Sequence, residues 1–442
     1  MGEHVMGEHV TVPVGPGSGP RVVGQRVVVV GQGYVGLPLA VRAVEAGHDV
    51  VGFDVDADRL KRLAGGESYV EDVTSDRLTA AVSTGRFQAT SEPRHCADFD
   101  IAVITVPTPL REGVPDLSHI EDAARVLGRY LRPGATVVLE STTYPGTTEE
   151  LVAVLLEETS GLTAGKDFHL GYSPERIDPG NAVWHFENTP KVVSGVNETS
   201  LAAVQAFYRT VVSETVPVSS PQVAELAKLL ENTFRHVNIA LVNELAMFAS
   251  ELGIDVWEAV DAAASKPYGF MKFTPGPGVG GHCLPIDPSY LSWRVKRFTG
   301  RNFRFVELAN DVNDHMPEYV VRRLMEALNH RGKPVKDSRI LLLGLAYKRN
   351  TGDARESPAR RVIELLIGLG GDVRAVDPHV VEAHVDPRVL RVELAASEVA
   401  AADAVVLLTD HDSFDHDVVI GNARYVLDCR RTLPPAANVE VL

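Results

Sequence analysis

A single cysteine stands in a stretch of the sequence that offers little core-forming material and much backbone freedom. Cys283 lies in the dodecamer 276–287, which carries four glycines in its first six positions, Gly276, Gly278, Gly280 and Gly281. Glycine lets a ligand lie against the main chain where a side chain would block it. A lone cysteine is usually a small buried hydrophobe, but a loop of glycine and proline builds no core, so we interpret this thiol as reactive. Asp287 follows four residues later and adds a carboxylate to the segment.

A lysine and an amide four residues apart, Lys228 and Asn232, share one face of a predicted helix. Together they could stabilise an oxyanion or polarise a hydroxyl, although a lysine on a helix is more often solvated. The helix is predicted to begin at Pro221, after two serines, and to end at Leu252–Gly253, with apolar residues recurring at helical spacing. About 33 residues at ~1.5 Å each give about 50 Å, so we expect it to join two domains and to pack against a second copy.

The first strand, predicted at 26–30, leads into a glycine-rich turn that is typical of dinucleotide binding. Gly31, Gly33 and Gly36 form G-x-G-x-x-G with Tyr34 and Val35 between them, a helix follows, and a second strand, 49–53, ends in Asp54. An unrelated tight turn is the alternative, but the acid 18 residues after the last glycine favours a dinucleotide. Because Asp54 would repel a 2′-phosphate, we predict NAD rather than NADP, with nearby Arg59 as the residue that argues against this.

Further strands predicted at 101–106 and 136–140 end in polar segments. In a parallel sheet, ligands lie beyond the carboxyl ends of the strands, where Thr108 and Thr142 stand as candidate cofactor contacts, Thr142 also as a candidate catalytic residue. Turn formation or helix capping is the alternative for both threonines. A strand at 168–172 leads to Glu175, which the pattern alone would place at the surface.

From Arg339 a second unit alternates strands and helices, and its first strand ends at Gly344 without G-x-G-x-x-G. Lys348 and Arg355 belong to a cationic segment after that strand, which could meet a phosphate or could be a solvated charge run.

The bulk properties exclude several functions. A net charge of −16 argues against nucleic acid or an anionic membrane as partner. Three cysteines show neither a disulfide nor a metal-binding pattern, so we predict a reducing, cytoplasmic location and no metal. The adjacent His282 does not make a Cys-His hydrolase pair, because neighbouring side chains point apart. Residues 1–24 read as a disordered tail, and no run is long enough to span a membrane.

These pieces, in this order, resemble the nucleotide-sugar 6-dehydrogenase family from about Gln25 to the carboxyl terminus. The motifs that carry the resemblance are 31–38 (GQGYVGLP), 106–109 (VPTP), 140–142 (EST), 173–175 (SPE), 228–232 (KLLEN), 280–283 (GGHC), 344–348 (GLAYK) and 351–358 (TGDARESP). The resemblance implies an α/β protein with an NAD-binding Rossmann domain at 25–217, a central helical dimerisation domain at 218–330, and a Rossmann-like UDP-sugar-binding domain at 331–442. It also implies a homodimer.

Two departures from the members that act on UDP-glucose narrow the expected substrate. Pro179 stands where those members have a second glutamate, and His282 and Ile286 replace a serine and a lysine. The form of 275–288 is similar to members that act on UDP-N-acetylglucosamine, so we expect that substrate, with UDP-N-acetylmannosamine, UDP-N-acetylgalactosamine and UDP-glucose as alternatives. A two-electron β-hydroxyacid dehydrogenase and a non-catalytic NAD sensor are further alternatives. The pathway that uses the product stays open.

The resemblance implies a four-electron oxidation. Taking an aldehyde to an acid needs a second hydride from a carbon that bears an added oxygen or sulfur, and the Cys283 thiolate would supply sulfur. Lys228, with a water held by Asp287, would handle the proton of the first oxidation. Lys228 and Asn232 would stabilise the thiohemiacetal oxygen, and Glu175 would activate water against the thioester. Two NAD are reduced per acid formed.

The resemblance also distributes the substrate contacts. Glu175, Lys228 and Asn232 would contact the sugar, Lys348 would meet the UDP portion, and Arg355 would reach NAD from the second domain. The backbone of the loop from Thr274 through Gly276 and Gly278 to Gly280 would lie along the sugar and phosphates. The site would thus lie between domains.

Overall fold

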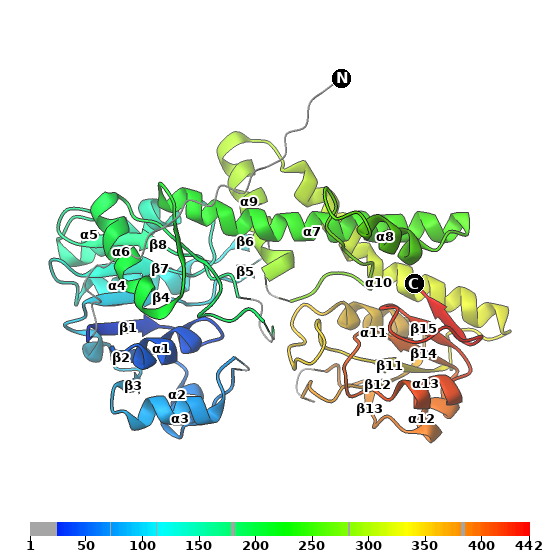
Figure 1. The fold of residues 1–442 in the computed structure, drawn as a ribbon. Helices are drawn as coiled ribbons and strands as arrows, with labels where there is room; N and C mark the ends of the chain where they lie inside the picture. Colours follow the sequence, from blue (N-terminus) through cyan, green and yellow to red (C-terminus); the bar gives the residue numbers. More distant parts are fainter. Residues whose placement is uncertain are drawn as a thin grey trace.

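Two α/β units joined by long helices make up the computed structural model (Figure 1). It describes residues 24–70, 72–111, 113–177, 181, 183–281, 283–381 and 385–442, with the side chain of Cys283 outside the description. The predicted disordered tail therefore lies outside the described residues except for Gly24. Pro179 and His282, which entered the substrate prediction, also lie outside them.

The amino-terminal unit is built on a six-stranded parallel sheet of order β3-β2-β1-β4-β7-β8. Its strands are β1 (Arg26–Val30), β2 (Asp49–Phe53), β3 (Phe87–Thr90), β4 (Ile101–Ile104), β7 (Thr136–Leu139) and β8 (His169–Tyr172). The valines of β1 alternate between two cores: Val27 and Val29 pack with α1 (Gly36–Glu45), and Val28 and Val30 pack with α4 (Ser118–Gly128). A sheet covered on both faces explains why β1 is apolar from Val27 to Val30.

The remaining elements of this unit surround the sheet. The helices are α2 (Ala57–Ala64), α3 (Ser75–Ser83), α5 (Ala153–Ser160) and α6 (Glu198–Val211), with a 3-10 turn at Pro93–Cys96 and a π-helical turn at Thr148–Val152. Two small sheets pair β5 (Leu110–Arg111) with β6 (Val114–Pro115) and β9 (Lys191–Val193) with β10 (Thr215–Pro217). The predicted Rossmann architecture is confirmed here, with β1, β4, β7 and β8 each shifted by no more than two residues from the predicted bounds.

The carboxyl-terminal unit repeats this plan with a parallel sheet of order β13-β12-β11-β14-β15-β16. Its strands are β11 (Arg339–Leu343), β12 (Asp372–Val376), β13 (Leu390–Arg391), β14 (Ala404–Leu407), β15 (Val426–Asp428) and β16 (Val439–Val441). Its helices are α11 (Pro358–Gly368), α12 (Ala396–Ala401) and α13 (His416–Asn422). The carboxyl ends of β11, β12, β14 and β15 therefore gather at one edge, where the ligands of such sheets lie.

The central helix α7 (Pro221–Leu252) passes alongside both units (Figure 1). It begins as the sequence predicts, because Ser220 accepts a hydrogen bond from the backbone N–H of Val223 and Pro221 takes the first position, and it ends at Gly253 in the left-handed conformation. Helices α8 (Val256–Ala264), α9 (Cys283–Thr299) and α10 (Arg304–His330) complete the centre.

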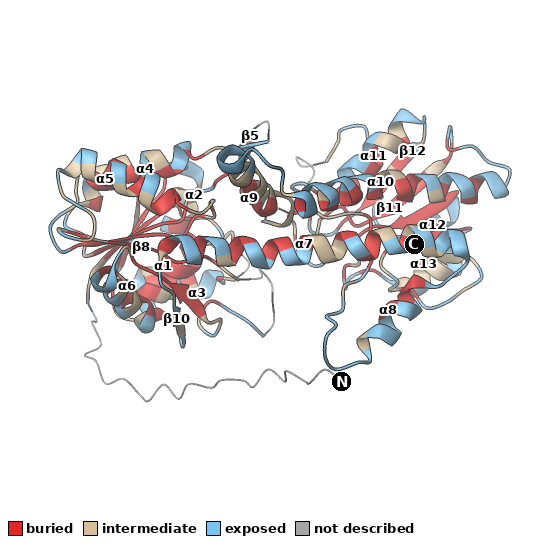
Figure 2. Cartoon of the chain, turned by 90° about the horizontal axis from the view of Figure 1, so that it is seen from above, coloured by how far each residue is buried: buried red, intermediate tan, exposed pale blue. Residues whose placement is uncertain are grey.

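One face of α7 stays uncovered within a single chain, as the exposed positions along the helix in Figure 2 show. Its exposed apolar side chains are Val223, Leu226, Leu230, Phe234, Leu241, Leu245, Phe248 and Leu252. They recur every three or four residues, with one step of seven between Phe234 and Leu241, and so form one stripe. Among the described residues, no helix combines the length and the apolar character needed to cross a membrane.

The interpretation of 276–287 as one continuous loop was wrong in its second half. Only the glycine-rich part is irregular, since α9 begins at Cys283 and carries Asp287 one turn later. Pro285 concealed this start, because proline is tolerated in the first turn of a helix, where its missing N–H has no partner to lose. Pro288 lies further inside the same helix.

Candidate active site

Four of the predicted residues meet where α7 passes the first turns of α9. Lys228 and Asn232, one turn apart on α7, are both buried. The Lys228 ammonium donates a hydrogen bond to the main-chain oxygen of Glu175, and the Asn232 amide donates to Oδ2 of Asp287 at 2.6 Å. The amide nitrogen that bonds a carboxylate must be a donor, which fixes the orientation of Asn232. An ammonium, an amide and a carboxylate thus converge at the beginning of the helix that starts with Cys283.

Asp287 is an unusually protonatable carboxyl group. It is 1% exposed, and this burial raises its pKa to about 6, while the Lys228 charge and the Asn232 hydrogen bond favour the ionised form and limit the rise. A carboxyl group with a pKa near neutrality can both accept and release a proton under working conditions. This property fits the predicted handling of a proton by Asp287 and Lys228.

The carboxylate of Glu175 points to a different group of residues. Its Oε1 accepts the backbone N–H groups of Arg176 (2.6 Å) and Ile177 (2.7 Å), and its Oε2 accepts Lys191 at 2.9 Å. Burial works to raise the pKa of Glu175, but Lys191 and the backbone donors outweigh it and lower the pKa. In this arrangement Lys228 donates to the main-chain oxygen of Glu175 and not to its carboxylate. The role of the Glu175 carboxylate as a base for hydrolysis stays a prediction.

Lys191 was not identified from the sequence, and Glu140 entered only as the first residue of the 140–142 motif, without a role. Lys191, buried at the start of β9, also contacts Oε1 of Glu140 at 3.1 Å, and Tyr208 donates to the same oxygen. Burial raises the pKa of Glu140 in spite of Lys191, and its Oε2 has no hydrogen-bond partner among the described residues. A lysine that opens an apolar strand, Lys-Val-Val, is the one signal that could have pointed to a buried ion pair.

The two threonines at the strand ends lie together. Thr108 donates from Oγ1 to the main-chain oxygen of Thr142 at 2.8 Å, and the buried Tyr290 of α9 donates to the main-chain oxygen of Thr108. The first bond joins the loops after β4 and β7 through the Thr108 side chain, and the second attaches α9 to the loop after β4. The contacts of Thr108 and Thr142 with a cofactor stay predictions.

The glycine-rich turn after β1 has the shape that a dinucleotide requires. A Cβ atom at Gly36 would lie 1.8 Å from the main-chain oxygen of Gly31, so close packing of the helix on the strand demands glycine there. A Cβ atom at Gly33 would meet no protein atom within 4 Å. Nothing inside the protein therefore requires glycine at 33, whereas the approach of a pyrophosphate does. Tyr34 and Val35 complete this turn, and the residues fit NAD.

Asp54, buried at the end of β2, lies beside the turn. Its Oδ2 accepts the backbone N–H of Gln32 at 2.7 Å and a guanidinium N–H of Arg59 at 2.9 Å. Because Arg59 pairs with the acid, the cation that argued for a 2′-phosphate is already neutralised. This pairing is consistent with NAD.

The glycine-rich loop before α9 lies between α7 and the carboxyl-terminal unit. The backbone N–H of Gly276 donates to Oδ1 of the buried Asn243 on α7 at 2.9 Å, whereas Thr274 is exposed. At the other end, Gly281 adopts a φ of 85°, and a Cβ there would lie 2.7 Å from the Tyr347 ring. Glycine is therefore required for the backbone conformation and for the contact.

Two cations of the carboxyl-terminal unit reach this region. Arg355 lies with its guanidinium carbon 5.8 Å from the centre of the Tyr34 ring, so it faces the dinucleotide turn, and its contact with NAD stays a prediction. Arg430, which the sequence reading missed, follows β15 and comes within 3.0 Å of the position a Gly276 Cβ would occupy. Lys348 is half-buried in the loop after β11. The sequence feature that could have pointed to Arg430 is its position as a cation shortly after the buried strand β15.

Glu225 is a further residue that the sequence did not reveal. It lies on α7, buried, and accepts the backbone N–H groups of Gly146 and Thr148 at 2.6 and 2.9 Å and the Thr148 hydroxyl at 2.7 Å. Burial raises its pKa to about 6 in spite of these donors. It fastens the segment after β7, which carries Thr142, to α7 one turn before Lys228.

Three models of one family match this chain in sequence. They describe the UDP-glucose/GDP-mannose dehydrogenase family: its NAD binding domain over residues 25–212, its central domain over 222–315, and its UDP binding domain over 341–435.

Individual relatives agree with these matches. A UDP-N-acetyl-D-mannosamine dehydrogenase from Pyrococcus horikoshii is 37% identical, over 88% of this chain and 90% of the relative. A UDP-N-acetyl-D-glucosamine 6-dehydrogenase from Salmonella typhi is also 37% identical, over 94% of this chain and 98% of the relative. The solved structure of a UDP-D-ManNAc dehydrogenase from Pyrococcus horikoshii superimposes with a TM-score of 0.86 at 34% identity, covering 94% of this chain and 98% of that one.

Proposed function

This chain belongs to the UDP-glucose/GDP-mannose dehydrogenase family and is an NAD-dependent UDP-sugar dehydrogenase, and we propose that it oxidises C6 of a UDP-N-acetylhexosamine to the acid. The first choice of substrate is UDP-N-acetyl-D-glucosamine. The observation that carries the proposal is the meeting of Lys228, Asn232 and Asp287 at the amino end of α9, the helix that begins with Cys283.

The proposed reaction assigns each residue a step. NAD supplies the acceptor for the hydride that leaves C6 in each oxidation. Asp287, through a water and beside Lys228, takes the proton of the C6 hydroxyl in the first oxidation, which leaves an aldehyde. The Cys283 thiolate then adds to the aldehyde carbon, and the oxygen of the resulting thiohemiacetal is held by the Lys228 and Asn232 donors.

Loss of the second hydride leaves a thioester, which water converts to the carboxylate with release of the Cys283 thiolate. We propose that Glu175, whose main-chain oxygen accepts a hydrogen bond from Lys228, accepts a proton from this water on its carboxylate. Thr142, at the end of β7, remains a proposed contact of the reacting carbon and the cofactor. The residues proposed for the UDP portion are Lys348 and the loop that runs from Thr274 through Gly276 and Gly278 to Gly280, with Arg430 as an added cation for the phosphates.

The identity of the hexosamine is the least determined part of the proposal. Relatives named for the mannosamine and for the glucosamine sugars are equally identical to this chain, at 37%. The family resemblance of 275–288 favours glucosamine. A panel of UDP-N-acetylglucosamine, UDP-N-acetylmannosamine, UDP-N-acetylgalactosamine and UDP-glucose, compared by kcat/KM, decides among them.

We further propose that two copies pair through α7. The apolar stripe along this helix is exposed in the single chain, and burying it requires a surface of equal length. A second α7 running alongside the first supplies one.

The stoichiometry of the reaction tests the proposed chemistry. Purified protein should form two NADH for each UDP-sugar consumed, because the oxidation removes four electrons. One NADH per substrate would instead indicate a two-electron hydroxyacid dehydrogenase, and cofactor binding without turnover would indicate a sensor. Cys283→Ser should form no acid, while the matched variant Cys96→Ser, which changes a buried cysteine in the 3-10 turn of the amino-terminal unit, should retain the two-to-one ratio.

A further inference from the structure

The acid that follows the second strand of the carboxyl-terminal sheet differs in its use from its counterpart in the amino-terminal sheet. Asp377 follows β12 as Asp54 follows β2. Each carboxylate accepts a backbone N–H from the residue after the glycine that follows the first strand of its unit: Asp54 accepts from Gln32, and Asp377 accepts from Leu345. Asp54 bonds two backbone N–H groups and Arg59. Asp377 bonds four backbone N–H groups and a histidine, which leaves its oxygens little capacity for a ligand.

The bonds of Asp377 fall into two sets. Oδ2 accepts Leu345 N at 2.6 Å and Ala346 N at 3.0 Å, which fixes the start of the segment after β11. Oδ1 accepts His379 N at 2.8 Å and Val380 N at 2.9 Å, which folds its own loop around the carboxylate. Burial works to raise the pKa of Asp377, but these donors and His411 outweigh it and hold the pKa well below the usual range.

His411, which is 1% exposed, connects the same carboxylate to the far end of that segment. Its Nε2 lies 3.0 Å from Oδ2 of Asp377, and its Nδ1 accepts the backbone N–H of Asn350 at 2.9 Å. A carboxylate only accepts and a backbone N–H only donates, so the partners assign the proton to Nε2. Both ring nitrogens are thereby engaged in holding the chain.

One buried pair therefore holds residues 345–350 at both ends, Asp377 at the start and His411 at the finish. The side chain of Asn350 also exchanges hydrogen bonds with Asp412, but these lie at the exposed surface, where they contribute less. Between the two ends the segment carries Tyr347 and Lys348.

The position of this segment determines the shape of the substrate loop. A Cβ at Gly280 would lie 2.8 Å from the Cβ of Tyr347, and a Cβ at Gly281 would lie 2.7 Å from the Tyr347 ring. The glycine-rich loop thus rests directly on the segment. A shift of Tyr347 would displace the backbone that leads into Cys283, and it would move Lys348 as well.

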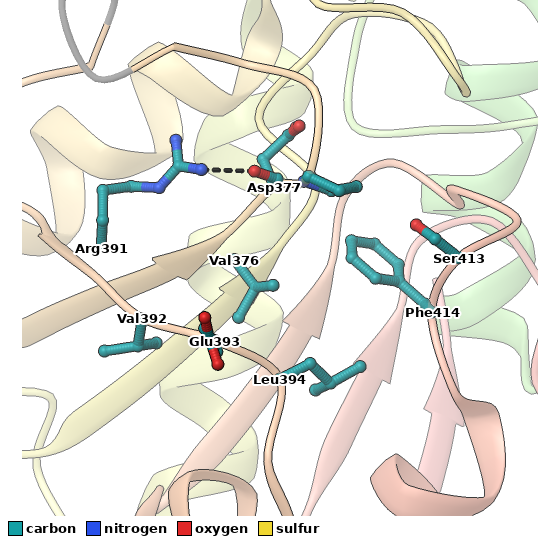
Figure 3. A pocket seen from close by; sticks show the side chains of 9 residues that line it. Val376, Asp377, Arg391, Val392, Glu393, Leu394, Ser413 and Phe414 are labelled. Carbon is teal, nitrogen blue, oxygen red and sulfur yellow. Dashed lines mark hydrogen bonds between the residues drawn. The ribbon is translucent and has the colours of Figure 1, made fainter.

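A cavity of about 500 Å³ beside Asp377 offers an alternative use for this acid (Figure 3). It is lined by Arg391 and Phe414, among others. Arg391, however, donates to the main-chain oxygen of Asp377 and not to its carboxylate. The carboxylate is occupied by the backbone and by His411, so the geometry favours a structural role for Asp377 over binding in the cavity.

We propose that Asp377 and His411 are positioning residues for the UDP-sugar, because together they hold Tyr347 and Lys348 in the place where the substrate loop and the UDP meet them. The inference rests on the proposed function, in which Lys348 of this segment contacts the UDP portion. When one end of the segment is released, only a fraction of the molecules hold the binding arrangement, and the apparent affinity falls by that fraction.

Two substitutions of His411 separate this role from general stability. His411→Asn keeps an acceptor near the Nδ1 position for Asn350 N, whereas His411→Gln keeps a donor near the Nε2 position for Asp377 and releases Asn350. With the full-length protein and UDP as the titrant in calorimetry, His411→Gln should weaken UDP binding about fivefold to fiftyfold, the range expected for a lost buried hydrogen bond. His411→Asn should stay within about threefold of wild type. The affinity for NAD should stay unchanged in both.

His379→Gln is the matched control. The His379 ring lies tilted against the His411 ring with centres 4.9 Å apart, but His379 gives Asp377 only its backbone N–H, which the substitution keeps. This variant should bind UDP as wild type does. Equal losses in His411→Asn and His411→Gln, or a loss of NAD affinity parallel to that of UDP, would overturn the inference, because either would indicate a general disturbance of the fold.

Hydrogen exchange of the wild-type protein keeps the test decisive if His411→Gln does not fold. The backbone amide of Asn350 should exchange slowly in the free protein. UDP should slow this exchange further, whereas NAD alone should leave its rate unchanged. Rapid exchange of this amide would overturn the inference. Wild-type protein that fails to bind UDP would overturn the proposed substrate along with it, whereas unchanged UDP binding by His411→Gln would overturn the positioning role alone.

Discussion

The guanidinium carbon of Arg355 lies 5.8 Å from the centre of the Tyr34 ring, so a cation of the carboxyl-terminal unit faces the dinucleotide turn of the amino-terminal one. Arg355 is held from behind by both carboxylate oxygens of Asp353, at 2.9 and 2.6 Å. A residue in this place can contact a cofactor only when the two units are near each other. The proposed contact of Arg355 with NAD would therefore couple cofactor binding to the arrangement of the two units.

Arg355→Ala should raise the Kd for NAD about threefold to tenfold, because it removes a cation beside the pyrophosphate turn. The affinity for UDP should change little. Fluorescence titration with NADH and calorimetry with UDP measure the two. Arg360→Ala, which removes an exposed arginine of α11, is the control and should leave both affinities unchanged. Equal effects of the two substitutions would contradict a specific role for Arg355.

The protonation of Asp287 should appear in the pH dependence of stability. Its folded pKa of about 6 lies above the ordinary value of 3.8, so the folded state binds this proton more tightly than the unfolded state. The resulting stabilisation is present below about pH 4 and is lost as the pH rises through 6, a change of about 3 kcal/mol. Asp287→Asn does not titrate, so its free energy of unfolding relative to wild type should rise by about that amount between pH 4 and pH 8.

Urea unfolding at the two pH values measures this difference. The same variant should lose activity at every pH, because the proposed proton acceptor is gone. A constant difference in the free energy of unfolding across the pH range would show that the pKa of Asp287 is the same in the folded and unfolded states.

Lys191→Met should destabilise the protein by about 3 to 5 kcal/mol near neutral pH, since it leaves Glu140 and Glu175 buried without their shared cation. The loss should shrink at acid pH, where the two carboxylates can take up protons. Lys166→Met removes an exposed lysine of the same unit and should change stability by less than about 0.5 kcal/mol. If the loss is the same at pH 5 and pH 8, the ion pairs do not account for it.

The three cysteines should differ in their reactivity toward iodoacetamide. Burial raises the pKa of Cys96 to about 11 and raises that of Cys429 strongly, so both remain thiols. At pH 8 and low reagent, peptide mapping by mass spectrometry should find Cys283 modified first, and UDP-sugar should slow its modification. Early modification of Cys96 or Cys429 would argue against a special reactivity of Cys283.

Pairing through α7 should be sensitive to charge placed on its apolar stripe. Leu241→Glu combined with Leu245→Glu should convert the dimer to a monomer in analytical ultracentrifugation, because two carboxylates would be buried without partners. Arg360→Glu adds charge on α11, away from the stripe, and should leave the sedimentation coefficient unchanged. A dimer that survives the double substitution must be formed by another surface.

The sequence was sufficient to predict elements whose patterns are local. The valines of β1, the turn from Gly31 to Gly36 and the Ser-Pro start of α7 each specify their structure over a few residues. The alternation of strands and helices before and after α7 indicates the two α/β units. The start of α9 escaped prediction, because Pro285 suggests irregular structure and is in fact acceptable in a first helical turn.

The hydrogen-bond partners of the candidate site residues were harder to predict than the residues themselves. Spacing indicated that Lys228 and Asn232 share a face, but their partners, the Glu175 main-chain oxygen and Asp287, come from distant segments. Lys191, Glu225 and Arg430 are single charged residues in ordinary surroundings, and their importance follows only from what the fold buries around them. Long-range pairing of this kind leaves no local pattern.

The length of α7 has a mechanical consequence. Lys228 and Asn232 lie on a single straight element that runs beside both α/β units. The contacts expected for NAD belong to the amino-terminal unit, and those expected for UDP belong to the carboxyl-terminal unit. A rotation of the two units about the α7 axis would bring NAD and the UDP-sugar to Lys228 and Asn232 without moving these two donors. A bend in α7 would instead misalign the donors with both reactants at once.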